Sequence, residues 1–309
     1  MLLVSTSIYP GCTTIESGQI VDKDFEPIVE RPAYPRGEGP VVLIDAAHGN
    51  FHTLDGRYRA FGRLLELDGC DVRSADSQVT PELLRDADVF VISNALKGGA
   101  DAEWVLPTPS AFTSGEIEYL RAWVDKGGSL LLIADHMPMP GATADLAKAF
   151  GFLFHNGFAF KTGTRQGTFH YTRSEGSLAE HAITEGRDAG ERIESVMVFT
   201  GQAFESSDGI EDIEPLFRVF DDMEVLLPER AWEFSDETPR IPATGMYQGA
   251  VRRYGSGRFA VFGEAAMFTA QQQVRDGNVR YMGLNHPEAP DNQQFVLNVI
   301  HWLTGELDH

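Results

Sequence analysis

The chain is short of cysteine, of long apolar runs and of basic residues, and each shortage argues against a class of protein. Two cysteines among 309 residues are too few for a disulfide framework. No apolar run approaches the roughly 20 residues of a transmembrane helix, so we expect no membrane span. Lysine and arginine number 25 against 46 acidic residues, a net charge of −21. Because this charge repels phosphate, we expect no nucleic-acid partner.

Several catalytic motifs are missing as well. The chain has no GxSxG elbow, no phosphate-binding GxxxxGK[ST] loop and no GxGxxG after its first predicted strand. Serine-hydrolase, nucleotide-triphosphatase and dinucleotide-dependent classes therefore lose their main support, and we expect no nucleotide cofactor. Cys70 opens a predicted strand instead of following one, which indicates a buried thiol and not a nucleophile.

Cys12 leaves the localisation open between cytoplasmic and exported. It lies in Pro10-Gly11-Cys12-Thr13-Thr14, which resembles the end of a bacterial lipoprotein signal, where the cysteine is lipidated. The residues before it are few and include no basic side chain, which speaks against a signal peptide. A start codon placed too far downstream would explain these departures.

What the chain does contain is an alternation of strands and helices that begins at residue 40. Residues 1–39 are polar and proline-rich and read as an extended lead-in. Residues 40–309 predict a single α/β domain, a flavodoxin-like three-layer sandwich with a mostly parallel central sheet. The connections between strands are long enough for crossovers, hence the parallel arrangement. The predicted buried strands are Val41–Ala46, Asp71–Ser74, Val89–Ser93 and Ser129–Ala134.

The helices between these strands are predicted from apolar spacing and from capping residues. One helix is expected to start near Asn50, because apolar residues recur at intervals of three and four. A capping box of Thr113 and Glu116 starts another. Pro138 and Pro140 predict a loop before a further helix. The apolar residues of the first helix are Phe51, Leu54, Tyr58, Phe61 and Leu65, and the last helix is expected over Ala142–Phe150.

Residues 151–240 form an insert in which phenylalanines alternate with glycine and polar residues, a pattern typical of short antiparallel strands or a covering flap. After the insert, Gly245–Tyr254 and Arg258–Gly263 predict a hairpin. A final helix is expected from about Pro290, with Gly305 just beyond its end.

The strongest candidate site is Asp135-His136, directly after the strand Ser129–Ala134. Open α/β sheets bind their ligands at the carboxyl ends of parallel strands. His136 there suits a general base or a metal ligand, and Asp135 suits a group that orients an imidazole or binds the metal. The alternative is structural: Asp135 bonds to loop amides while His136 packs beneath the flap.

A second pair of candidates, His48 and His52, follows the first strand. Their spacing of four would allow both rings to converge on a divalent metal, most simply zinc. The alternative is that His48 caps the loop and His52 is partly exposed. The sequence therefore predicts a metal site here without excluding a structural role.

Three more polar residues follow late strands or precede the final helix. Glu264 could supply an acid, a base or a metal ligand, or could cap a helix that starts at Ala265. Asn94 could orient a substrate carbonyl or serve as a turn residue. His286, in the loop before the final helix, could reach the same edge of the sheet as a substrate-binding group.

The order of these segments resembles the class I glutamine amidotransferase-like superfamily. The likeness is to its divergent branches: the trehalose-utilisation-type proteins and the amidotransferase-like domains of gliding-motility and ciliary proteins. It covers roughly 40–150 and 245–305, about half the chain. The matching segments are Val41–His48, Asp88–Asn94, Glu116–His136, Arg258–Glu264 and Asn285–Gly305.

The resemblance implies where the site lies but not glutamine hydrolysis. In true amidotransferases, the turn after the strand that corresponds to Ser129–Ala134 carries a nucleophilic cysteine, supported by a histidine and a glutamate after a late strand. Here that turn holds Asp135-His136, and the late strand ends in Gly263-Glu264 without the histidine. We therefore expect no glutaminase, since a shared fold does not transmit an activity.

Two functions remain open. The first is a hydrolase-like enzyme, metal-assisted through some of His48, His52, Asp135 and His136, that acts on a small polar or carbohydrate-related substrate. A metal would supply the nucleophile by lowering the pKa of bound water to about 7. The second is a non-catalytic ligand-binding module of an envelope lipoprotein. Both require segments 41–48 and 129–136 to lie side by side and to point the same way.

Overall fold

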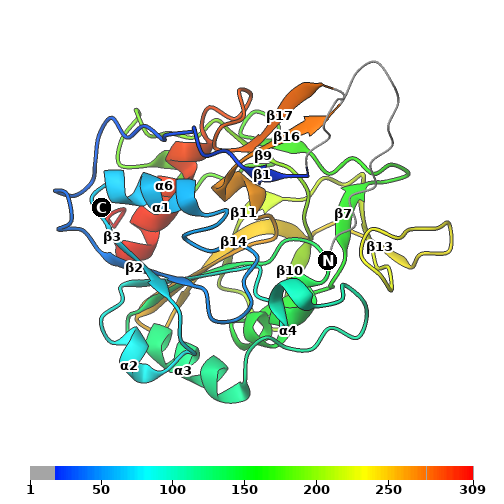
Figure 1. Cartoon of the computed structure of the whole chain (residues 1–309), viewed down its shortest axis with the longest axis horizontal. Helices are drawn as coiled ribbons and strands as arrows, with labels where there is room; N and C mark the ends of the chain where they lie inside the picture. Colours follow the sequence, from blue (N-terminus) through cyan, green and yellow to red (C-terminus); the bar gives the residue numbers. More distant parts are fainter. Residues whose placement is uncertain (1–17, 276, 309) are drawn as a thin grey trace, which may run out of the picture.

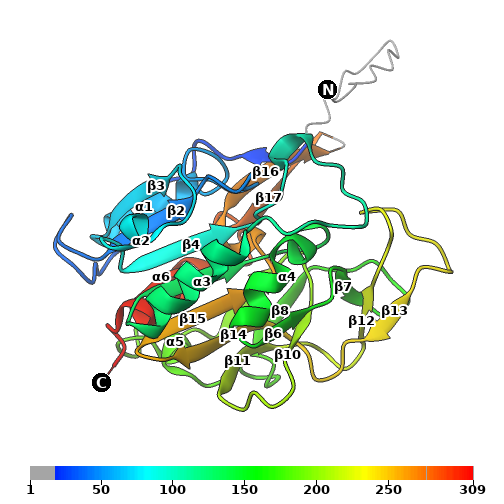
Figure 2. The ribbon, with the colours of Figure 1, turned by 90° about the horizontal axis from the view of Figure 1, so that it is seen from below.

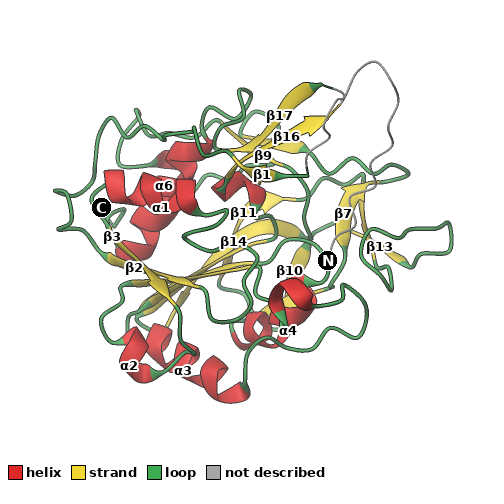
Figure 3. Ribbon diagram, viewed as in Figure 1, coloured by secondary structure: helices red, strands yellow, loops and turns green. Residues whose placement is uncertain are grey.

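The computed structural model describes residues 18–275 and 277–308, and its elements are arranged around one large twisted sheet (Figures 1 and 3). Cys12, on which the export question depends, lies outside the described residues. Within the described part of the chain, no helix is both long and apolar enough to cross a membrane.

Five parallel strands form one half of the large sheet. In spatial order they are β3 (Asp71–Ala75), β2 (Val41–Asp45), β4 (Val89–Ser93), β5 (Ser129–Ile133) and β15 (Gly257–Phe262). Counted along the chain, this is the order 2-1-3-4-5 of a flavodoxin-like core. The predicted α/β class and the parallel core are thus confirmed.

The other half of the sheet is antiparallel. β14 (Tyr247–Tyr254) returns beside β15, as the predicted hairpin requires, and the sheet continues through β10 (Phe204–Ser206) to β6 (Phe152–Phe154). β11 (Ile213–Arg218) also pairs with β14. Part of the insert therefore extends the central sheet instead of forming only a flap.

Helices cover both faces of the parallel half. Helices α1 (Arg59–Leu67) and α6 (Asn292–Thr304) lie on one face (Figure 1). Helices α2 (Pro81–Leu84), α3 (Ser114–Asp125) and α4 (Met139–Ala149) lie on the other, and Figure 2 shows α3 and α4 across it. Each face buries its own apolar cluster, because alternate residues of a strand point to opposite sides of the sheet.

Smaller elements surround this core. A three-stranded antiparallel sheet joins the lead-in to the segment after β15, and two further small sheets lie in the insert. The first sheet comprises β1 (Ile20–Val21), β16 (Ala270–Arg275) and β17 (Asn278–Gly283). The others comprise β7 (Phe158–Lys161), β12 (Met223–Leu226) and β13 (Arg240–Pro242), and β8 (Phe169–Thr172) with β9 (Ser195–Val198). Short helices are η1 (Gly99–Asp101), α5 (Ala182–Glu185) and η2 (Ala266–Phe268).

The two segments on which the functional hypotheses depend do point the same way. β2 and β5 each run parallel to β4, which lies between them. The expectation that they are immediate neighbours is therefore wrong, while their common direction is confirmed. Both deliver the residues that follow them to the same edge of the sheet.

Two helices start elsewhere than predicted. α1 begins at Arg59 and not near Asn50, because the amides of residues 51–58 are used in turns: Phe51 N–H donates to the Asn94 carbonyl, and Tyr58 N–H to that of Thr53. α4 begins at Met139, so Pro140 opens a helix instead of forcing a loop. A proline in the first turn is tolerated because the amide it lacks has no intrahelical partner there.

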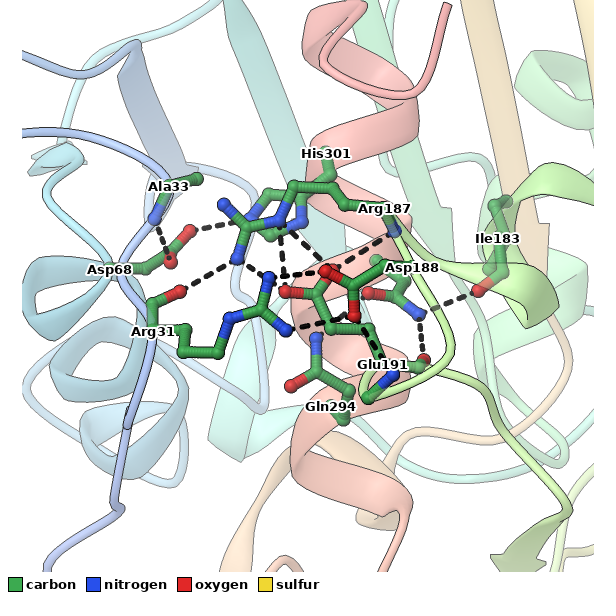
Figure 4. A network of polar contacts seen from close by, with 11 residues as sticks. Arg31, Ala33, Asp68, Ile183, Arg187, Asp188, Glu191, Gln294 and His301 are labelled. Atoms are coloured by element: carbon green, nitrogen blue, oxygen red, sulfur yellow. Dashed lines mark hydrogen bonds and ion pairs between the residues drawn. The ribbon is translucent and has the colours of Figure 1, made fainter. Parts of the chain in front are cut away.

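A buried polar network fastens the lead-in to the domain (Figure 4). Asp68, at the end of α1, accepts a hydrogen bond from the Ala33 amide at 2.8 Å, and its other oxygen lies 2.6 Å from His301 Nε2 on α6. Arg31 pairs with Asp188 in the insert. His301, expected to be structural, is fully buried here, so its imidazole links α1 to α6.

Gly201 packs too closely beneath the rim of the sheet to be replaced. A Cβ atom there would lie 1.9 Å from the Gly263 carbonyl oxygen and 2.9 Å from Gln248 Nε2. We expect Gly201→Ala to lower the free energy of unfolding by about 1–3 kcal/mol, because backbone would have to move. Gly115→Ala is the control: its Cβ would meet only Thr113 Oγ1, at 3.9 Å. In helix α3 it should stabilise by up to about 1 kcal/mol. Urea unfolding of both variants checks the contrast, and equal effects would contradict it.

Candidate functional site

A cleft opens where the parallel strands end. It consists of two adjacent hollows of ≈ 530 and ≈ 370 Å³, and we call the residues that line either one the rim cleft. Asp135 follows β5 and Glu264 follows β15, so the sheet itself positions both carboxyl groups. The residues that line both hollows are Gln19, Asp135, His136, Trp232, Ala266 and Gln273.

The rim cleft brings together five of the seven candidates from the sequence. Asp135, His136, Glu264 and His286 line the larger hollow. His52, together with Asp135 and His136, lines the smaller one. His48 and Asn94 line neither hollow.

Asp135 and His136 face each other at the centre of the cleft. Asp135 Oδ1 lies 3.3 Å from His136 Nε2, and the side chains are 15% and 12% exposed. The other ring nitrogen, Nδ1, is 2.8 Å from the Met137 carbonyl oxygen. Because a carbonyl only accepts, Nδ1 carries a proton. Nε2 is therefore the nitrogen free to exchange a proton with the carboxylate or with a molecule beside it.

Asn94 supports this arrangement from behind. Its side-chain oxygen accepts the Asp135 amide at 2.9 Å, and its own amide donates to the Ile133 carbonyl. It adopts a left-handed backbone conformation with φ 46°, which asparagine tolerates better than most residues. Asn94 is buried, so the turn role expected as its alternative is the one seen, and the predicted substrate contact is not.

Aromatic rings enclose His136. Phe158 stacks on the imidazole at 4.6 Å between centroids, Trp232 meets it edge-on at 4.6 Å, and Trp104 lies at 5.9 Å. Trp232 is 51% exposed and has φ 68°, a conformation that is unusual for a bulky residue. An exposed aromatic side chain held at such a cost lies where function is the usual reason for strain.

Glu264 is a carboxyl group held away from water. It is 1% exposed and accepts the amides of Ala266 at 2.7 Å and Met267 at 2.8 Å, so it caps η2 as its structural alternative predicts. Burial raises its pKa well above the usual range and the charge of Asp135 adds to this, although the amides act the other way. Two carboxyl groups in one cleft therefore favour different protonation states, a pattern typical of acid–base pairs.

His48 forms a buried triad with two carboxylates and does not reach the cleft. Its Nδ1 lies 2.9 Å from Asp45, its Nε2 lies 2.9 Å from Glu116, and Phe112 stacks on the ring at 4.2 Å. Burial alone would lower the pKa of His48, but the two carboxylates raise it above its usual value. Both nitrogens are occupied, so His48 has no lone pair for the metal that the sequence predicts.

His52 is likewise buried and not partly exposed. Its ring stacks on Tyr58 at 5.0 Å, and Nδ1 lies 3.4 Å from Ser93 Oγ. Burial lowers its pKa to about 3, with Arg57 adding to the shift, so the imidazole is neutral. Among the described residues, no three His, Cys, Asp or Glu side chains are placed to hold a metal. The predicted zinc site stays a prediction, and His48 and His52 do not fit it.

Several cleft residues had no signal in the sequence. Arg57 and Trp104 line the smaller hollow, and Arg280 comes from the β16–β17 hairpin, which was not predicted. Trp232 comes from the loop between β12 and β13. Each reaches the cleft through tertiary packing, so neither periodicity nor a motif points to it.

Comparison with known proteins shows the fold and not a family. No family model and no curated protein matches the chain. A solved structure of the mmIFT52 N-terminal domain is similar over 85% of this chain and 97% of that domain, with a TM-score of 0.57 and 14% identity. At that identity the likeness extends to the fold alone.

Two further solved structures carry names close to the resemblance seen in the sequence. A ThuA-like protein from Bacteroides uniformis is covered over 94%, against 90% of this chain, with 11% identity and a TM-score of 0.46. A protein described as a GMP synthase component, from Thermoplasma acidophilum, is covered over 98%, against 88% of this chain, with 11% identity and a TM-score of 0.44. Both TM-scores are below 0.5, so neither structure carries an argument about function.

Proposed function

We propose that the chain is a hydrolase-like enzyme that binds a small polar or carbohydrate-related molecule in the rim cleft. The observation that carries this proposal is the pairing of Asp135 and Glu264 at the ends of adjacent strands, one partly exposed and one buried with a raised pKa. The exposed ring of Trp232 beside them suits the apolar face of a sugar.

The chemistry follows from the two carboxyl groups. Asp135 takes a proton from a water molecule, whose oxygen attacks the electrophilic carbon of the substrate. Glu264, protonated because of its raised pKa, donates its proton to the leaving group. His136 Nε2, 3.3 Å from Asp135, holds the carboxylate and the water in register. No step is routed through a metal, since His48 and His52 do not form a ligand set.

We propose further that the chain is a divergent, flavodoxin-like member of the glutamine amidotransferase-like superfamily. The 2-1-3-4-5 strand order and the likeness to the mmIFT52 N-terminal domain support the fold. Asp135 stands where the superfamily has its nucleophilic cysteine, which supports a site at the same edge with a different reaction.

A second candidate is the non-catalytic ligand-binding module of an envelope lipoprotein. The observation in its favour is that His48 and His136 do not converge: one is tied to Asp45 and Glu116, and the other to the Met137 carbonyl. Such a module would keep the aromatic walls of the cleft and lack turnover.

Chromogenic substrates separate the two candidates. We expect the purified full chain to release nitrophenol from one class among nitrophenyl glycosides, esters and phosphates, with and without added zinc. Turnover that does not depend on zinc supports the enzyme with Asp135 as base. Turnover that requires zinc restores the metal hypothesis. Binding of a saccharide without turnover of any class favours the binding module.

A further inference from the structure

Arg57 is an unusual cation in this acidic protein. Most arginines lie within 4.0 Å of a carboxylate. Among the side chains that the structure describes, five have no carboxylate partner at that distance, and four of these are exposed. The five are Arg36, Arg57, Arg165, Arg218 and Arg280, of which Arg57 alone is partly buried.

Neutral groups hold Arg57 in place. Nη1 donates to Gln271 Oε1 at 2.6 Å, and Nη2 donates to the Gln19 carbonyl at 3.2 Å. The guanidinium carbon lies 4.3 Å from the centre of the Phe51 ring. These contacts fix the orientation of the group without neutralising its charge. A guanidinium has five N–H donors, so donors remain for a ligand.

The surroundings of Arg57 favour an anion from outside. His52 beside it is neutral, and Asp135, the carboxylate of the same hollow, lies beyond ion-pair distance. Burial lowers the pKa of Arg57, with the charge of Asp135 acting the other way. Arg280, in the larger hollow, also has no described carboxylate partner. Two cations without partners thus line one cleft of a protein with a net charge of −21.

We propose that Arg57 is an anion-binding group and that the molecule taken up by the rim cleft carries an oxyanion, either a carboxylate or a phosphate. A guanidinium binds either group through paired N–H donors. This inference rests on the proposed function for the polar or sugar-like body of the ligand, and it adds the acidic substituent. The planar fork of Arg57 is the specificity-determining feature.

Binding of matched sugars to the full-length protein tests the inference. The probes are glucuronate, glucose 6-phosphate and glucose, titrated by calorimetry and followed through the fluorescence of Trp104 and Trp232. We expect one of the two anionic sugars to bind at least about tenfold more tightly than glucose, as a charge-assisted hydrogen bond provides. The preferred anionic sugar identifies the carboxylate or the phosphate as the group recognised. Equal affinity for all three sugars, or no binding of either acid, overturns the proposal.

Two variants assign the effect to Arg57. Arg57→Gln should remove the preference for the anion and leave the affinity for glucose within about twofold. Arg57→Lys should restore part of it, because the charge remains but the fork is lost. Arg59→Gln is the matched control: it removes the same charge from an exposed arginine, paired with Glu26, that does not line the cleft. A preference that survives Arg57→Gln contradicts the assignment.

These outcomes are independent of turnover. Selective binding of the acid without hydrolysis of any nitrophenyl class would refute the enzyme and leave the anion subsite standing. Hydrolysis with no preference for an anionic substrate would support the enzyme and refute the subsite. Thermal unfolding of each variant shows whether a lost affinity reflects the site or a lost fold.

Discussion

Replacing His48 with alanine is expected to lower the free energy of unfolding by about 3–5 kcal/mol. The substitution leaves the carboxylates of Asp45 and Glu116 in the protein interior without the cation that lies between them. It also removes the ring that stacks on Phe112. Urea unfolding at neutral pH measures the loss.

Two further variants calibrate this value. His48→Gln keeps a donor for only one of the two carboxylates, so it should lose less than alanine does. His170→Ala is the control, because His170 is only partly buried and its Nδ1 lies 3.3 Å from Ser195 Oγ. We expect the control to cost at most about 1 kcal/mol. A loss below about 1 kcal/mol for His48→Ala would show that the triad does not hold the rim together.

The triad also predicts a dependence of stability on pH. The pKa of His48 is raised from its usual 6.5, so its contribution is complete below 6.5 and is lost as pH rises through the folded value. Burial would raise the pKa of Glu116, but the Thr113 amide and His48 hold it below its usual 4.5. Its contribution is complete above 4.5 and is lost as pH falls. Stability from the triad should therefore be greatest between pH 4.5 and 6.5, and His48→Ala should flatten both limbs.

The sequence predicted the framework well because local patterns specify it. The capping box of Thr113 and Glu116 is present at the start of α3, and Gly305 ends α6 with φ 86°. The buried strands from β2 to β5 follow their apolar runs. The β16–β17 hairpin was missed because its polar residues, Gln271 to Gln273 among them, show no alternation of apolar and polar side chains.

The candidate site could be located but not completed from the sequence. Asp135 and Glu264 were found because a residue that follows a parallel strand must lie at its edge of the sheet. The partner of His48 was not foreseen, since Glu116 is 68 residues away and reaches the imidazole only when α3 packs. Arg57 and Trp232 likewise depend on loops whose paths are set by tertiary contacts.

Asp135→Asn is expected to reduce kcat/KM by about 10²- to 10⁴-fold for whichever nitrophenyl substrate the enzyme cleaves. Asparagine has the same shape but cannot take a proton from water. The Asp135 backbone amide still donates to Asn94 Oδ1, so the turn is preserved. Thermal unfolding should therefore stay within a few degrees of the native chain. Asp145→Asn, the same change at an exposed position of α4, is the matched control and should leave kcat/KM unchanged.

The same variant separates catalysis from binding, because Asp135 and Arg57 line one hollow with opposite charges. Removing the negative charge of Asp135 removes a repulsion toward an acidic ligand, so glucuronate or glucose 6-phosphate should bind as tightly as before or more tightly. A collapse of kcat with retained affinity assigns Asp135 to the chemical step. If affinity and kcat/KM fall together, Asp135 is a binding residue, and the base must be sought at His136.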